Sequence, residues 1–144
     1  MTTDEEIFDN PTGWVNRHIQ TYVESGGTKG TLWNGYPTLL ITTRGRKSGK
    51  LRRTALIYGQ DGKNYLIVGS KGGAPNHPFW YLNLVKNPEV ILQVGEDRFT
   101  ARARTASSEE KPRLWQKMTK IFPLYIKYQA KTEREIPVVV LEPV

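Results

Sequence analysis

Residues 38–58 read TLLITTRGRKSGKLRRTALIY, in which two apolar runs flank a cationic turn. The runs, 38–43 and 51–58, are rich in Thr, Leu and Ile, and the turn holds two glycines. This pattern predicts a β-hairpin with a basic tip. Six of the ten residues from 44 to 53 are Arg or Lys and none is acidic, so the tip is a predicted anion site to which backbone N–H groups also contribute.

Positive charge continues from the turn into the second strand through Arg52 and Arg53. Because successive strand residues point to opposite faces, each face of this strand carries one arginine. Such a cation is costly to hold beside a barrel interior unless it meets an anion or a carboxylate. The alternative interpretation of the tip is a solvated turn whose charges only keep the sheet edge soluble.

The pattern beyond the hairpin predicts more antiparallel strands. The dipeptide DG at 61–62 is typical of a hairpin turn, so 38–43, 51–59 and 63–69 are expected to form three consecutive antiparallel strands. Further strands are expected at 90–94, 99–105 and 136–141. The last of these is rich in Val, which predicts burial on both faces.

Three helices are expected. A short amphipathic helix begins near Trp14 and ends before Gly26, and its short apolar face favours packing against the protein over lying on a membrane. A second helix is predicted over 79–86. The sequence SSEE at 107–110 is a capping-box start for a longer helix, which Pro123 should kink.

The length and composition indicate one globular domain. The chain has 144 residues, of which 38% are hydrophobic and 24% are charged. We therefore expect a single domain over 1–144, with 1–35 as its N-terminal helix and loop. About six strands, two or three helices and no βαβ rhythm predict an α+β fold, a small antiparallel β-barrel with helices over its ends.

The charge balance restricts the class of partner. A net charge of +7 predicts a polyanionic partner, which is nucleic acid, an anionic membrane surface or a phosphorylated small molecule. The chain has no cysteine, and His18 and His77 are far apart in the sequence, so no metal site is expected. His77 is interpreted as a capping or core residue. Because the N-terminus is acidic and no apolar run approaches about 18 residues, a cytoplasmic location is expected.

A second cationic segment is GSKGG at 69–73, after the third expected strand. Its small residues allow a ligand ring to approach the backbone, and Lys71 supplies a mobile cation. The segment lacks the spacing of a phosphate-binding Walker A loop. An ordinary glycine-rich connection before a helix is the alternative.

Two aromatic groups follow this segment. In HPFWYLNL at 77–84, Trp80 and Asn83 share one stripe of the predicted helix. Aromatic stripes are most often core, but a buried amide such as that of Asn83 is not typical of a core. Tyr125 and Tyr128 lie one helical turn apart, and they belong either to the core or to a pocket for a flat substrate.

Three segments together resemble the deazaflavin-dependent nitroreductase family of actinobacteria. They are residues 38–58, VGSKGGAPNHPFWYLNLVKNPEV at 68–90 and FPLYIKYQAKTEREIPVVVLEP at 122–143. Members of this family are small split β-barrel enzymes that use coenzyme F420, an 8-hydroxy-5-deazaflavin with an anionic oligoglutamate tail. The resemblance therefore implies a split β-barrel and F420 as the cofactor.

The resemblance also implies a role for particular residues. It places the cofactor tail and phosphate against Arg46, Lys47, Ser48 and Arg52, with Gly49 in the same turn. It places the deazaflavin ring beside Arg53, Thr54, Ala55, Leu56 and Ile57. It completes the cofactor site with Gly69, Ser70, Lys71, Phe79, Trp80, Tyr81 and Asn83.

The implied reaction is hydride transfer from reduced F420 to an electron-poor acceptor, with menaquinone-like quinones and nitro compounds as the acceptors. The implied acceptor pocket is lined by Ile57, Ser70, Phe122, Tyr125 and Tyr128. No side chain is expected to act as a catalytic nucleophile. Because Ile57 and Phe122 stand where nitroimidazole-reducing members have tyrosine, that activity is not carried over to this chain.

Other functions remain open from the sequence. FMN is the nearest alternative cofactor, although it has no oligoglutamate tail to match so many cations. A basic barrel that binds single-stranded nucleic acid is a second alternative, and binding of a cofactor without turnover is a third. We expect a small-molecule partner and no nucleic acid, while the oligomeric state and peripheral contact with the membrane stay open.

Overall fold

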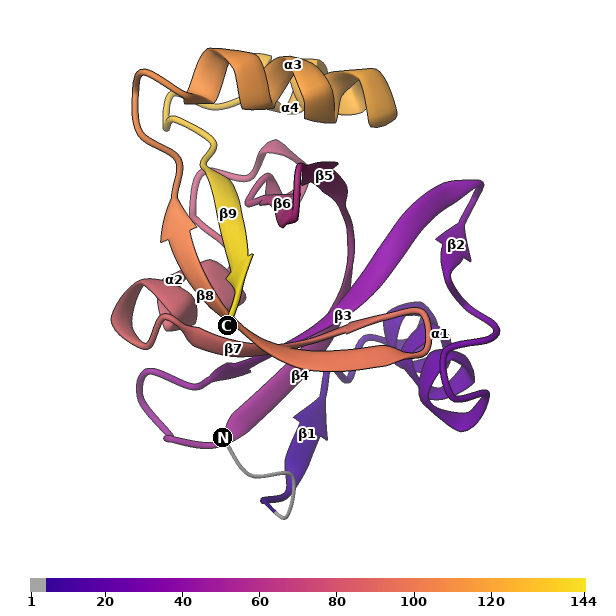
Figure 1. Cartoon of the computed structure of the whole chain (residues 1–144). Coiled ribbons are helices and arrows are strands. Elements are labelled where there is room, and N and C mark those ends of the chain that lie inside the picture. The colour runs from indigo at the N-terminus through magenta and orange to yellow at the C-terminus, as the bar shows by residue number, and fades with distance from the viewer. Residues whose placement is uncertain (1–4) are drawn as a thin grey trace.

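The computed structural model describes residues 5–144 and has an α+β fold with one large mixed sheet (Figure 1). The strand order is β1-β4-β3-β7-β8-β9-β6-β5, and β2 pairs with β3 outside this path. The strands are β1 (Ile7–Asp9), β2 (Leu32–Trp33), β3 (Tyr36–Arg44), β4 (Leu51–Ile57), β5 (Gly59–Asp61), β6 (Asn64–Val68), β7 (Glu89–Val94), β8 (Asp97–Thr105) and β9 (Val138–Pro143).

The expectation of about six strands is wrong in number, and the expectation of antiparallel pairing fails for one pair. Nine strands form within the described residues, because β1, β2 and β5 are only two or three residues long and too short to show a periodic pattern. In addition, β1 runs parallel to β4, whereas the other pairs are antiparallel.

The basic hairpin forms as its sequence predicts. Strands β3 and β4 pair in antiparallel register from Thr38 opposite Ile57 to Arg44 opposite Leu51. The pairing extends into the turn, where the Gly45 N–H donates to the Lys50 carbonyl at 2.7 Å.

The third expected strand does not pair beside the second. β6 pairs with β5 and β9, so β4 and β6 lie near opposite ends of the strand order. The chain that follows β4 separates from β3 after Tyr58. The Tyr58 N–H still donates to the Pro37 carbonyl at 3.1 Å. Gly62 then turns the chain back with a φ of 61°, a backbone conformation that glycine adopts without strain.

In the described part of the chain, four α-helices surround the sheet: α1 (Gly13–Glu24), α2 (Phe79–Lys86), α3 (Lys111–Ile121) and α4 (Leu124–Ala130). The expected long C-terminal helix is therefore two helices, because Phe122 leaves helical geometry just before Pro123. The capping box precedes α3 as predicted: Glu110 accepts from the Ser107 N–H at 2.8 Å, and Ser107 Oγ accepts from the Glu110 N–H at 3.3 Å.

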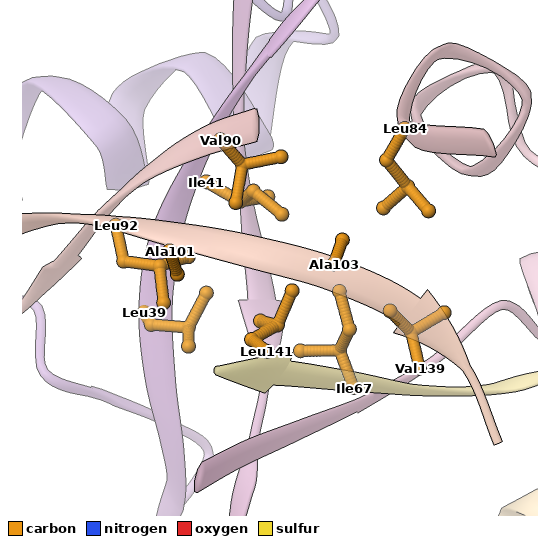
Figure 2. Close-up of a cluster of buried hydrophobic side chains, with 10 residues drawn as sticks. All are labelled: Leu39, Ile41, Ile67, Leu84, Val90, Leu92, Ala101, Ala103, Val139 and Leu141. Atoms are coloured by element: carbon orange, nitrogen blue, oxygen red, sulfur yellow. The ribbon is translucent and has the colours of Figure 1, made fainter. Parts of the chain in front are cut away.

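Across residues 5–144, the core consists of three clusters of buried side chains. Side chains from β3, β6, β7, β8 and β9 meet Leu84 of α2 in the first cluster (Figure 2). The second joins α3 and α4 to β6 and β9, and the third joins α1 to Leu40. As the run of valines predicts, β9 is buried from Val138 to Leu141. Helix α1 packs against the sheet, with Ile19 and Tyr22 fully buried.

Candidate functional site

A cavity of about 1130 Å³ lies between the basic hairpin, the segment after β6 and the aromatic side chains of three helices. Its lining comes from six parts of the chain, at 8–18, Trp33, 38–57, 68–72, 78–83 and 122–128. A volume of this size accommodates a cofactor together with a second small molecule. Lys47 and Lys71, which are 24 positions apart in the sequence, both line this one cavity.

One end of the cavity is cationic. Arg46, Lys47, Arg52 and Lys71 line it, and none of them takes part in the ion pairs formed within residues 5–144. Arg53 differs from these four because its Nε lies 2.5 Å from Oδ1 of Asp9. The charges of the two arginines on the opposite faces of β4 thus have different surroundings. Arg53 pairs with a carboxylate, whereas Arg52 contacts an aromatic ring and solvent.

Two phenylalanine rings contact three of the four cations at this end. Arg46 Cζ and Lys71 Nζ lie 5.5 and 5.4 Å from the ring centroid of Phe79. Arg52 Cζ lies 5.4 Å from that of Phe8. Cation–π contacts of this kind orient a charge while leaving it open to an anion. Phe8 was not predicted, because it lies in a three-residue parallel strand that has no recognisable signal in the sequence.

Helix α2 fixes the base of the basic turn. Asn83, which is 5% exposed, accepts a hydrogen bond from the Arg46 N–H at 3.0 Å and donates to Thr43 Oγ1 at 3.2 Å. Lys86 Nζ donates to the Arg46 carbonyl at 3.1 Å. The buried amide of Asn83 therefore positions the turn, which explains why an asparagine stands in an otherwise apolar stripe.

The free edge of β4 forms one wall of the cavity. Because the Tyr58 N–H bonds to β3, the alternation of an antiparallel ladder turns the N–H and C=O groups of Ala55 and Ile57 away from β3. β1 covers this edge only as far as Asp9, and in the described chain no strand continues beyond it. The wall therefore presents alternating backbone donors and acceptors to a ligand.

The other end of the cavity is aromatic. Trp14 and Trp33 stack with their centroids 5.5 Å apart near the outer surface. Phe122 meets Tyr125 edge to face at 4.9 Å and lies 6.1 Å from Tyr128. Burial raises the pKa of Tyr125 well above its ordinary value, so this hydroxyl stays protonated. The two tryptophans were not among the predicted site residues.

The structure brings most of the predicted site residues to this cavity. Its lining includes Arg46, Lys47, Ser48, Arg52, Arg53, Thr54, Ala55, Leu56, Ile57, Ser70, Lys71, Phe79, Trp80, Asn83, Phe122, Tyr125 and Tyr128. Gly49, Gly69 and Tyr81 are not in it. Gly49 belongs to the turn, where its φ is 71°. Gly69 packs closely against Pro137, because a Cβ at this position would lie 2.9 Å from it. The Tyr81 hydroxyl forms a hydrogen bond with Thr105 at 2.8 Å.

His77 also lies outside this cavity, in a smaller one of about 240 Å³.

Across residues 5–144, no group of three or more His, Asp or Glu side chains is placed to bind a metal ion. Over the same residues, no helix combines the length and the apolar character needed to cross a bilayer.

Comparison with known proteins adds independent information. Residues 14–143 match the family model described as F420H(2)-dependent quinone reductase. A protein of Mycobacterium tuberculosis (strain H37Rv) named F420H(2)-dependent quinone reductase is 40% identical over 141 residues, which cover 89% of this chain and 95% of that protein.

Two solved structures share the fold and a substantial part of the sequence. A structure described as a domain-swapped dimer is 39% identical, with a TM-score of 0.71, and the match covers 92% of this chain and all of that one. A structure of an F420-H2-dependent reductase, FDR-A, is 41% identical, with a TM-score of 0.69, over 74% of this chain and 94% of that one.

Proposed function

The chain belongs to the F420H2-dependent quinone reductase family and is thus an oxidoreductase with coenzyme F420 as its cofactor, and we propose that both F420 and the quinone bind in the large cavity. The observation that carries this proposal is the continuity of the cavity. One space joins cations that form no ion pair within residues 5–144, a strand edge that no strand of the described chain covers, and a group of aromatic rings.

The residues present fit the cofactor. A phosphate and an oligoglutamate tail need several cations free of carboxylate partners, and Arg46, Lys47, Arg52 and Lys71 meet that need. A deazaflavin carries alternating carbonyl and N–H groups along its pyrimidine edge. The outward backbone groups of Ala55 and the adjacent wall of β4 are complementary to such an edge. FMN would leave most of these cations without a partner.

Each part of the site then has a distinct task. When bound, the reduced cofactor supplies a hydride from C5 of its ring. The cations hold the tail, and the β4 edge orients the ring, so that the protein contributes positioning and the exclusion of water. Asn83 keeps the basic turn in place beneath the tail.

The aromatic end binds the acceptor. A quinone stacks against Phe122, Tyr125 and Tyr128, which bring its ring alongside the β4 wall. The protonated hydroxyl of Tyr125 and the Ser70 side chain are hydrogen-bond donors for the oxygen on which negative charge develops. Flat nitroaromatic compounds fit the same surface, and we expect them to be slower acceptors because Ile57 offers them no hydroxyl.

Three further features belong to this proposal. The open sheet serves as a split β-barrel, supported by the approach of β4 to β6 although they lie near opposite ends of the strand order. Residues 5–144 act as one domain, because the core clusters connect each helix of this range to the sheet. The enzyme works in the cytoplasm. Its peripheral contact with the membrane is supported by the exposed side chains of Trp14 and Leu32, which lie near the aromatic end.

Titration of the protein with oxidised F420, followed by quenching of the cofactor fluorescence, tests the binding half of the proposal. We expect a Kd of about 1 μM or tighter, corresponding to about 8 kcal/mol. FMN should bind far more weakly, and a single-stranded oligonucleotide should not compete. Tighter binding of FMN than of F420 would overturn the assignment. Reduction of a menadione-type quinone by F420H2 then tests turnover.

A further inference from the structure

The segment that carries Lys71 has a strained backbone. Residues Lys71, Gly72 and Gly73 have φ values of 47°, 62° and 82°, so three consecutive residues are left-handed. Within residues 5–144, Lys71 and Asn34 are the non-glycine residues with positive φ. A lysine does not adopt this conformation without cost, and the surrounding structure must hold it there.

Arg134 supplies that support from the segment between α4 and β9. Its guanidinium donates to three carbonyls of the loop at 69–74: Nε to Ala74 at 2.8 Å, Nη1 to Gly69 at 3.1 Å and Nη2 to Ser70 at 2.6 Å. None of the ion pairs among the described residues includes Arg134. An arginine whose N–H groups donate to several backbone carbonyls, and not to a carboxylate, fixes the backbone conformation of that segment.

His77 completes this set of contacts. Arg134 Nη1 also donates to His77 Nδ1 at 3.0 Å, which requires that nitrogen to be unprotonated. The His77 ring packs beside Tyr81, with centroids 4.8 Å apart, and it lines the smaller cavity and not the large one. Burial, and then the charge of Arg134, lower the pKa of His77, which keeps it a neutral acceptor.

The same segment is fastened to α4, which bears the acceptor-side tyrosines. Gln129 donates to the Arg134 carbonyl at 2.8 Å and accepts from the Ile136 N–H at 2.9 Å. The loop itself touches α4, because a Cβ on Gly73 would lie 2.7 Å from the Tyr128 carbonyl oxygen. Arg134 therefore stands between the loop that carries Lys71 and the helix that carries Tyr128.

We propose that Arg134 is a positioning residue that holds the loop at 69–74 in the conformation that brings Lys71 to the bound cofactor. This inference rests on the function proposed above. Arg134 itself does not line the large cavity. It raises the affinity for the cofactor only through its hydrogen bonds to the carbonyls of the loop. The alternative is that Arg134 only stabilises the fold.

Three variants separate these roles. Arg134→Gln removes the guanidinium, and Arg134→Lys keeps the charge but cannot span three carbonyls. Arg113→Gln is the matched control, because Arg113 pairs with Asp61 on the surface, at 2.8 Å, and does not line the cavity. Circular dichroism and thermal unfolding establish whether each variant is folded. If Arg134→Gln does not fold, Arg134→Lys takes its place in the test.

Hydrogen exchange of the protein without cofactor is the first measurement. The Gly73 and Ala74 N–H groups donate to the carbonyls of Ser70 and Lys71, at 2.9 and 3.1 Å. Both amides should exchange about tenfold faster or more in Arg134→Gln, less so in Arg134→Lys, and unchanged in Arg113→Gln. Unchanged exchange at these two amides in a folded Arg134 variant would overturn the proposal.

A double-mutant cycle on F420 binding is the second measurement. Arg134→Gln should weaken binding about tenfold, with the KM for the quinone changed less than twofold, and Lys71→Gln should weaken it by a similar factor. The double variant should bind hardly less tightly than either single variant, because Arg134 acts through Lys71. Additive losses would overturn the inference. If wild-type protein fails to bind F420 while the exchange result holds, the proposed function fails and the role of Arg134 in the loop stands.

Discussion

The two ends of the large cavity are built in opposite ways. At the cationic end, Lys47, Arg52 and Lys71 are exposed, and Arg52 and Lys71 contact phenylalanine rings that do not belong to a buried cluster. At the aromatic end, Phe122 and Tyr125 are buried members of the cluster that joins α3 and α4 to the sheet. Binding and folding should therefore separate at the first end and coincide at the second.

The two ends therefore differ in how freely their residues can change. A cation at the mouth of the cavity can change without disturbing the packing, so cofactor affinity is adjustable there. An acceptor-side ring is also a structural part of the core, and a change in the acceptor pocket carries a cost in stability.

The largest effect is expected at the aromatic end. Phe122→Ala should lower the free energy of unfolding by about 3–5 kcal/mol, because it removes a ring from a packed cluster and leaves a cavity. Urea denaturation measures this loss. Leu124→Ala, at a position 41% exposed, is the control and should cost less than about 1 kcal/mol. A comparable loss in both variants would contradict the division.

Removal of two cations should affect binding alone. The double variant Lys47→Ala, Arg52→Ala should raise the Kd for F420 about 100-fold, the result of losing two charge-assisted contacts. Its free energy of unfolding should stay within about 0.5 kcal/mol of the wild type. Lys63→Ala, in the exposed β5–β6 turn, is the control for removing a single positive charge away from the cavity. A large loss of stability would show that this end is also structural.

A smaller effect is expected from Phe8, which orients Arg52 and Lys50. Phe8→Leu should weaken F420 binding about threefold, the loss expected for partly exposed cation–π contacts. Phe8→Tyr keeps an aromatic face and should restore the wild-type affinity. If leucine and tyrosine variants bind equally, the ring has no part in holding these cations.

The smallest effect concerns pH. The folded protein favours neutral His77, which faces Arg134, Tyr81, Lys111 and Glu135, and burial lowers its pKa. Because the unfolded pKa is near 6.5, stability from this group is complete above about pH 6.5 and falls as the pH drops below it. Urea denaturation at about pH 5.5 and 7.5 should show a smaller pH dependence for His77→Gln than for wild type. Equal pH dependence would exclude His77 as its source.

Local patterns in the sequence predicted a large part of the fold. The hairpin at 38–58, the helix over 79–86 and the capping box at 107–110 depend on neighbours within a few positions, and all three are confirmed. Pairing between distant segments was not predictable in this way. The partnership of β6 with β9 and the short parallel strand β1 result from tertiary packing that no local pattern records.

The candidate site shows the same limit. The resemblance identified the F420-dependent chemistry, which the family match confirms, and the individual residue roles stay predictions. Asn83 was noticed as an unusual buried amide, but its use by the basic turn depends on a contact across 37 positions. Arg134 gave no signal at all, because its partners are carbonyls some 60 positions away and carbonyls are common to every residue.

The affinity of the protein for F420, compared with that for the same deazaflavin without phosphate and oligoglutamate, tests the central claim most directly. We predict that the complete cofactor binds about 100-fold more tightly at low salt, and that Lys47→Ala and Lys71→Ala each reduce this ratio. Equal affinity for the two compounds, or a ratio that neither substitution changes, would contradict the claim that both lysines serve one ligand in one cavity.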